Sequence, residues 1–149
     1  MEPDNPDAWR EAYDIAVASQ DLEEAGRRAA RLLELYVGLG ESALAQRFVR
    51  EVEDQKVAPL PQRFYLLAAG LAERGDSRWA IALYENAVAA EPAAPAAFKA
   101  LFRQAQILRM VGDIAEAREA FTHARAHAAC TDGFRRAIDK ALTETAFPR

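Results

Sequence analysis

One short pattern occurs twice in this chain, and it constrains the fold more than any other feature. Each copy begins with Gly-Asp. An Ala follows four residues after the Asp, an aromatic residue four residues after that Ala, and a second Ala three residues after the aromatic residue. The copies run from Gly75 to Ala87 and from Gly112 to Ala124. A glycine commonly ends a helix in a left-handed conformation, and Asp or Ser commonly caps the next helix. Because spacings of three and four share a helix face, the pattern predicts two equivalent helix-turn-helix joints.

The composition favours helices along the whole chain. Of its 149 residues 51% are hydrophobic, and Ala and Leu are common while Gly and Pro number only seven each. This usage is typical of helices and not of sheets. The length allows one domain, or a short array, to bury a core without a metal or a disulfide. We therefore expect an all-α fold.

Apolar residues recur at helical spacing in eight segments that are separated by Gly, Pro, Asp or Ser. The expected helices cover about 6–19, 22–37, 42–54, 62–74, 77–90, 95–111, 114–128 and 131–146. The longest connection, 55–61, contains Pro59 and Pro61, neither of which can continue a helix. The other connections are short, which predicts antiparallel packing of successive helices.

The segment from Pro61 to Ala94 resembles one unit of the tetratricopeptide repeat, a helix-turn-helix of about 34 residues. The matching residues are Phe64, Leu67, Ala68, Leu71, Gly75, Ala80, Tyr84, Ala87 and Pro92, and Ala and Leu stand where the family usually has Gly and Tyr. Further units match at Gly112, Ala117, Phe121 and Ala124, and more poorly at Gly40, Ala45 and Val49. A competing frame would begin a repeat at Asn5, but Ala25 to Ala45 then spans one helix instead of two.

The resemblance implies a right-handed α-α superhelix of about eight antiparallel helices, a solenoid that forms a single domain over 1–149. In this frame a leading helix at 6–19 precedes repeats at about 22–57, 61–94 and 95–130. A capping helix follows at 131–146. The first helix of each unit would line a concave groove that holds a peptide or helix of another protein.

The expected partner-binding residues lie on the first helices of two units. They are Tyr65, Lys99, Phe102, Arg103, Gln106 and Arg109. Lys99 and Arg103 look like the Lys-x-x-x-Arg pair with which some family members clamp a C-terminal carboxylate. The clamp's other positions hold Ala30, Glu34 and Ala69, so only a basic wall for an acidic or amphipathic segment is expected. The alternative is that these charges form the solvated face of an amphipathic helix.

Charge and motifs narrow the function classes. The net charge of −4 and the pI near 5.3 argue against nucleic acid and anionic membranes as partners. The C-terminal part of the chain is the more positive one. Residues 1–94 contain 10 Lys/Arg and 17 Asp/Glu, whereas residues 95–149 contain 9 Lys/Arg and 6 Asp/Glu. We see no leader or membrane-length apolar run, and expect a cytoplasmic protein without membrane insertion. A homodimer is possible, and self-association or regulation of a larger enzyme or membrane protein is the alternative function.

No residue pattern indicates catalysis or a cofactor. The serines fall at helix ends, where capping explains them, and no glycine-rich phosphate loop is present. His123, His127 and Cys130 share one flank with Glu116 and Glu119, and these are zinc-ligand types. Because the chain has no other His or Cys, exposed polar residues at a helix end are the preferred interpretation. We therefore expect neither an enzyme nor a metalloprotein.

Overall fold

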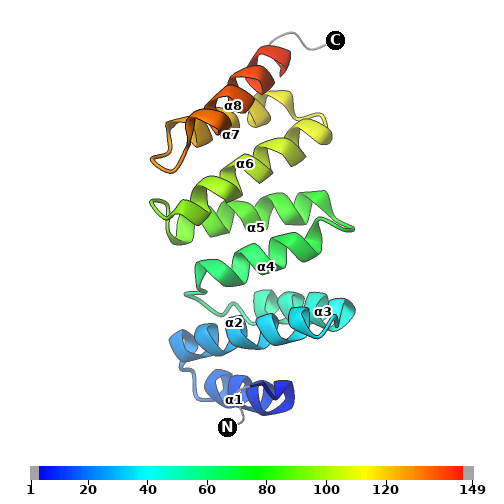
Figure 1. Ribbon diagram of the computed structural model, residues 1–149. Coiled ribbons are helices and arrows are strands. Elements are labelled where there is room, and N and C mark those ends of the chain that lie inside the picture. Colours follow the sequence, from blue (N-terminus) through cyan, green and yellow to red (C-terminus); the bar gives the residue numbers. More distant parts are fainter. Residues whose placement is uncertain (1–3, 146–149) are drawn as a thin grey trace. The chain divides into compact units, whose positions relative to one another are not determined.

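The computed structural model describes residues 4–145, and every regular element in that range is an α-helix (Figure 1). The helices are α1 (Pro6–Ala18), α2 (Leu22–Gly38), α3 (Ser42–Asp54), α4 (Gln62–Ala72), α5 (Ser77–Ala90), α6 (Pro95–Met110), α7 (Ile114–Ala126) and α8 (Asp132–Thr145). The all-α prediction is confirmed, and the helix ends differ by at most about two residues from the expected ones. Residue 146, the expected end of the last helix, lies outside the described residues.

The contacts within the chain divide it into two compact units, Met1–Gly75 and Asp76–Arg149. The first unit contains α1 to α4 and the second contains α5 to α8. The division falls inside 61–94, the segment that best resembles a single repeat. The repeat frame itself stays a prediction.

In the first unit α2 is the central helix and packs against α1, α3 and α4, while α3 also packs against α4. The core between them contains Tyr13, Leu32, Leu33 and Phe64, all fully buried. The ring of Phe48 meets that of Tyr13 edge to face, with centroids 5.1 Å apart. Such pairs stabilise a core beyond the apolar area that they bury.

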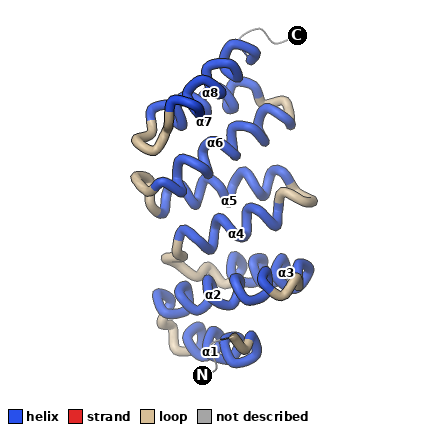
Figure 2. Tube along the Cα trace, in the orientation of Figure 1, coloured by secondary structure: helices blue, strands red, loops and turns tan. Residues whose placement is uncertain are grey.

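In the second unit each helix packs against the next one along the chain, as the tube in Figure 2 shows for α5, α6, α7 and α8. Its core includes the buried side chains of Leu83, Leu108, Phe121 and Ile138. Both copies of the repeated pattern face this core. Their six members are all buried: Ala80, Tyr84 and Ala87 on α5, and Ala117, Phe121 and Ala124 on α7.

The two joints differ in detail. Gly112 has a φ of +89°, which confirms the left-handed end expected there, but Gly75 has no positive φ and the same expectation is wrong for it. The chain after α4 instead turns tightly, with the Gly75 N–H donating to the Ala72 carbonyl at 3.1 Å. Asp76 caps α5 by accepting from the Trp79 N–H at 3.0 Å. Asp113 makes no such bond, and its carboxylate pairs with Arg78 of α5.

Candidate functional site

The predicted basic residues of the second unit lie along one face of α6. Lys99 is exposed, and no ion pair or hydrogen bond engages its side chain within residues 4–145. Arg103 donates to the Gln106 side-chain oxygen at 3.2 Å. Arg109 pairs with Glu144 of α8 at 2.7 Å, so its charge is already partly compensated. Among these three residues, Lys99 is therefore the one whose charge has no partner within the described range.

Phe102 is less available than the sequence suggested. Its ring is half-buried and lies 6.0 Å from that of Phe121 on α7 and 5.3 Å from that of Phe134 on α8, centroid to centroid. Phe98 joins the same group, with its centroid 5.0 Å from that of Phe134. The cluster holds α6, α7 and α8 together, and only part of the Phe102 ring can meet a ligand.

Tyr65 belongs to α4 in the first unit. Its side chain is half-buried, and its ring lies 6.0 Å from that of Phe64, centroid to centroid. Burial, and secondly the negative charge of Glu53, raise the pKa of the Tyr65 hydroxyl. It therefore stays protonated at neutral pH and can act as a hydrogen-bond donor.

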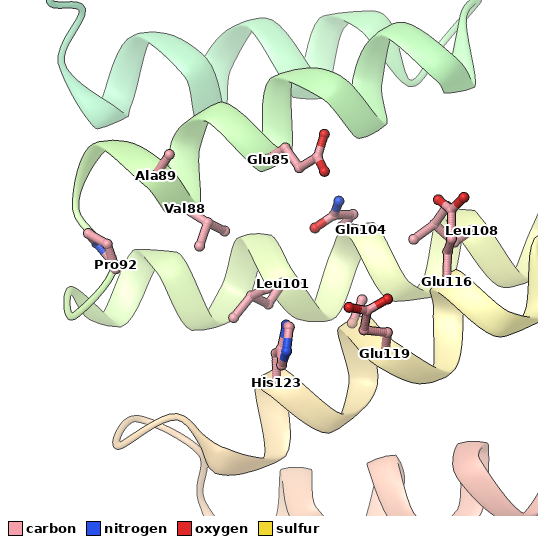
Figure 3. A pocket seen from close by; sticks show the side chains of 11 residues that line it. Glu85, Val88, Ala89, Pro92, Leu101, Gln104, Leu108, Glu116, Glu119 and His123 are labelled. Atoms are coloured by element: carbon pink, nitrogen blue, oxygen red, sulfur yellow. The ribbon is translucent and has the colours of Figure 1, made fainter.

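A groove of about 610 Å³ crosses the second unit between α5 and α7, with α6 as its floor (Figure 3). It is lined by Glu85, Val88, Ala89 and Pro92 on the α5 side, Leu101, Gln104 and Leu108 on α6, and Glu116, Glu119, Ala120 and His123 on α7. At 100° per residue, Leu101 and Leu108 are about half a turn from Lys99 and Gln106, and Gln104 is about 100° from Arg103. The groove thus lies on the face of α6 opposite the predicted one.

The rim of this groove is acidic. Glu85, Glu116 and Glu119 are exposed, and so is His123 beside them. The pKa of Arg78 is raised by its hydrogen bond to Asp113 and, more weakly, by the charge of Glu116. In the part of the chain that the structure describes, Glu85, Glu119 and His123 have no ion pair or hydrogen bond. The carboxylates of Glu85 and Glu119 are thus available to a ligand.

Gln104 is the unusual residue of the floor. It is only 7% exposed, yet nothing between residues 4 and 145 forms a hydrogen bond with its amide. Its amide nitrogen and oxygen are not among the fully buried atoms without a partner, so they stay open to the groove, where a ligand can form hydrogen bonds with them. The sequence signal was present, because Gln104 stands between Leu101 and Leu108 in the apolar stripe of α6. Gln104 was nevertheless not among the residues predicted from the sequence.

The zinc-ligand types do not converge. His127 turns away to the α5–α6 connection, where its Nε2 lies 2.9 Å from the Pro92 carbonyl oxygen, and its Nδ1 accepts from the Ala129 N–H at 3.0 Å. Cys130 is buried. No group of three or more His, Cys, Asp or Glu side chains that could hold a metal occurs among residues 4–145. The structure thus gives His127 a role in fixing two loops.

The first unit has a smaller hollow of about 340 Å³, lined by Arg10, Tyr36, Leu44, Arg47, Phe48 and Glu51. Two of its three charged residues pair with each other, because Arg10 donates to Glu51 at 2.8 Å. The Arg10 guanidinium also lies 5.5 Å from the centre of the Phe48 ring. These contacts join α1 to α3 and explain the hollow as part of the packing.

No protein-family model matches this chain, and no curated protein matches it either. Within residues 4–145 no helix has both the length and the apolar character needed to cross a membrane. The resemblance to the tetratricopeptide repeat therefore rests on the residues quoted above.

Proposed function

We propose that this chain is a noncatalytic protein-interaction module that binds a peptide or helical segment of another protein. The proposal includes the tetratricopeptide relationship and the right-handed superhelix that the relationship implies. The observation that carries it is the repeated joint, whose two copies bury equivalent side chains on α5 and α7. Helix pairs built in this way use one face for stacking and leave another for ligands.

The proposed partner at the face of α6 that carries Lys99 and Arg103 is an acidic or amphipathic segment. Lys99 is exposed and unpaired within the described range, and Arg103 lies one turn further along the same face. Gln106 orients the Arg103 guanidinium through their hydrogen bond. The exposed part of Phe102 supplies an apolar contact next to these charges, a combination suited to an amphipathic ligand.

The test is selection of random 12-residue peptides on the immobilised full chain, followed by affinity measurement. We expect acidic amphipathic peptides among the binders. The double variant Lys99→Glu with Arg103→Glu should weaken their binding at least about tenfold, since it replaces attraction by repulsion. Affinity should also fall with added salt.

The matched control is Arg136→Glu with Lys140→Glu, which makes the same charge change on the exposed surface of α8. It should leave the affinity within about twofold, because those residues lie on another helix. Equal weakening by both variants would show a general charge effect and reject the assigned face. Failure to select any peptide, together with concentration-dependent association in sedimentation, would favour the self-association alternative.

A further inference from the structure

The groove between α5 and α7, whose floor is α6, contains a polar side chain without a hydrogen-bond partner among the described residues. The Gln104 side chain is more than nine-tenths buried, and within residues 4–145 it has no hydrogen-bond partner. Figure 3 shows its amide and the Glu85 carboxylate directed into the same groove. The side-chain nitrogen and oxygen of Gln104 are not among the fully buried atoms without a partner, so the amide stays open to the groove and is available to a ligand there. The residue therefore fits a binding role better than a structural one.

The surroundings of Gln104 define the chemistry of a ligand. The surface beside it is aliphatic, with Leu101 and Leu108 on the floor and Val88 on the α5 side. Glu85 on one wall and Glu119 on the other carry carboxylates that are unpaired among the described residues. An aliphatic floor between two carboxylates suits a Lys or Arg side chain, whose methylene stem is apolar and whose end is cationic.

We propose that this groove is a second binding site, for an extended basic segment of a partner protein. A peptide group of the segment pairs with the Gln104 amide, which offers both a donor and an acceptor. Aliphatic side chains of the segment cover the floor, and Lys or Arg side chains meet Glu85 and Glu119. The site lies on the opposite face of α6 from Lys99 and Arg103, so both sites can be occupied at once.

Two other occupants fit less well. A polyamine offers hydrogen-bond donors only, so it leaves the donor side of the Gln104 amide unpaired. Helix α8 of a second copy, which also carries Arg and Lys side chains, has its peptide groups engaged within the helix and cannot offer them to Gln104. An extended segment satisfies both requirements because its peptide groups are free on at least one side.

The test uses the same selection of 12-residue peptides on the full chain. The selected peptides are examined for a second class, distinct from the acidic peptides. We expect peptides with Lys or Arg next to Leu, Ile or Val. Gln104→Met, which keeps the length of the side chain, should weaken this class about tenfold while changing Tm little, because the amide is open to the groove. A merely structural Gln104 would instead show a change in Tm without the loss of affinity. Glu85→Gln with Glu119→Gln should weaken the class to a similar extent and reduce its salt dependence.

The control for charge is Glu11→Gln with Asp54→Asn, which removes two exposed carboxylates from the first unit. It should leave the affinity of the basic peptides unchanged. The inference is overturned if no basic class is selected, if that class binds Gln104→Met as tightly as wild type, or if spermidine displaces it at equal concentration. Self-association that Gln104→Met abolishes would also overturn it. Acidic peptides that depend on Lys99 and Arg103 report separately on the proposed function.

Discussion

Gly26 shows how a single residue fixes the packing between a helix and a loop. It lies in α2, and a Cβ atom added there would collide with the carbonyl oxygen of Pro59 in the α3–α4 connection. That oxygen belongs to the backbone and cannot rotate away. Glycine is therefore required for close approach, even though it lowers helix propensity by about 1 kcal/mol relative to alanine.

We predict that Gly26→Ala lowers the free energy of unfolding by about 1–3 kcal/mol, because the α3–α4 connection must move to admit the methyl group. Urea denaturation followed by circular dichroism measures it. The matched control is Gly70→Ala in α4, where an added Cβ meets nothing within 4 Å. That change should raise stability by up to about 1 kcal/mol. Two variants that stabilise equally would contradict the close approach.

At the scale of elements, the joints before α5 and α7 look alike in sequence but make different demands on their glycines. Gly112 has a φ of +89°, whereas Gly75 has no positive φ and a Cβ atom added there would meet nothing within 4 Å. We predict that Gly112→Ala costs about 1 kcal/mol of stability, since alanine is strained in the left-handed region. Gly75→Ala should cost nothing measurable. Thermal unfolding of both variants checks this, and equal losses would mean that the joints share one geometry.

The ion pair between α5 and the start of α7 predicts a pH dependence. The hydrogen bond from Arg78 lowers the pKa of the Asp113 carboxyl below its ordinary value of about 3.9. A lowered pKa in the folded state contributes stability above about pH 4, which is lost as the pH falls through the folded-state pKa. Asp113→Asn should therefore be less stable than wild type at pH 7, and the difference should disappear towards pH 2.

The check is a series of denaturation curves from pH 7 to pH 2, repeated at 1 M salt, where the difference should also shrink. Arg78→Gln serves as the partner control. It should reproduce the pH profile of Asp113→Asn, and the double variant should add little to either. Additive effects of the two substitutions would mean that the side chains act independently.

The helices were predictable because local signals determine them. Asp76 and the spacing of Ala80, Tyr84 and Ala87 mark the start and the inner face of α5, and the structure agrees. The φ of Gly75 was not predictable, since the tight end of α4 leaves it no need for a left-handed conformation. Local pattern thus predicts which side chains are buried better than how each connection turns.

At the scale of the whole molecule, the sequence predicted one face of α6 and missed the other. Lys99 and Arg103 were found because four-residue spacing places them together. The groove was missed because it depends on which helices flank α6, and Glu85 and Glu119 come from α5 and α7. Spacing along one helix cannot bring such residues together. Gln104 alone indicated the groove, as a polar residue within an apolar stripe.

The division into two units predicts that the second one folds by itself. Residues 76–149 contain α5 to α8, with each helix packed on the next around buried side chains such as Leu108 and Phe121. We predict that this fragment is helical by circular dichroism and unfolds in one cooperative transition. The control is the fragment 95–149, which lacks α5. The side of α6 that packs against α5 is then uncovered, so the unfolding of this fragment should no longer be cooperative. A noncooperative 76–149 would mean that the compact units are not independent folding units.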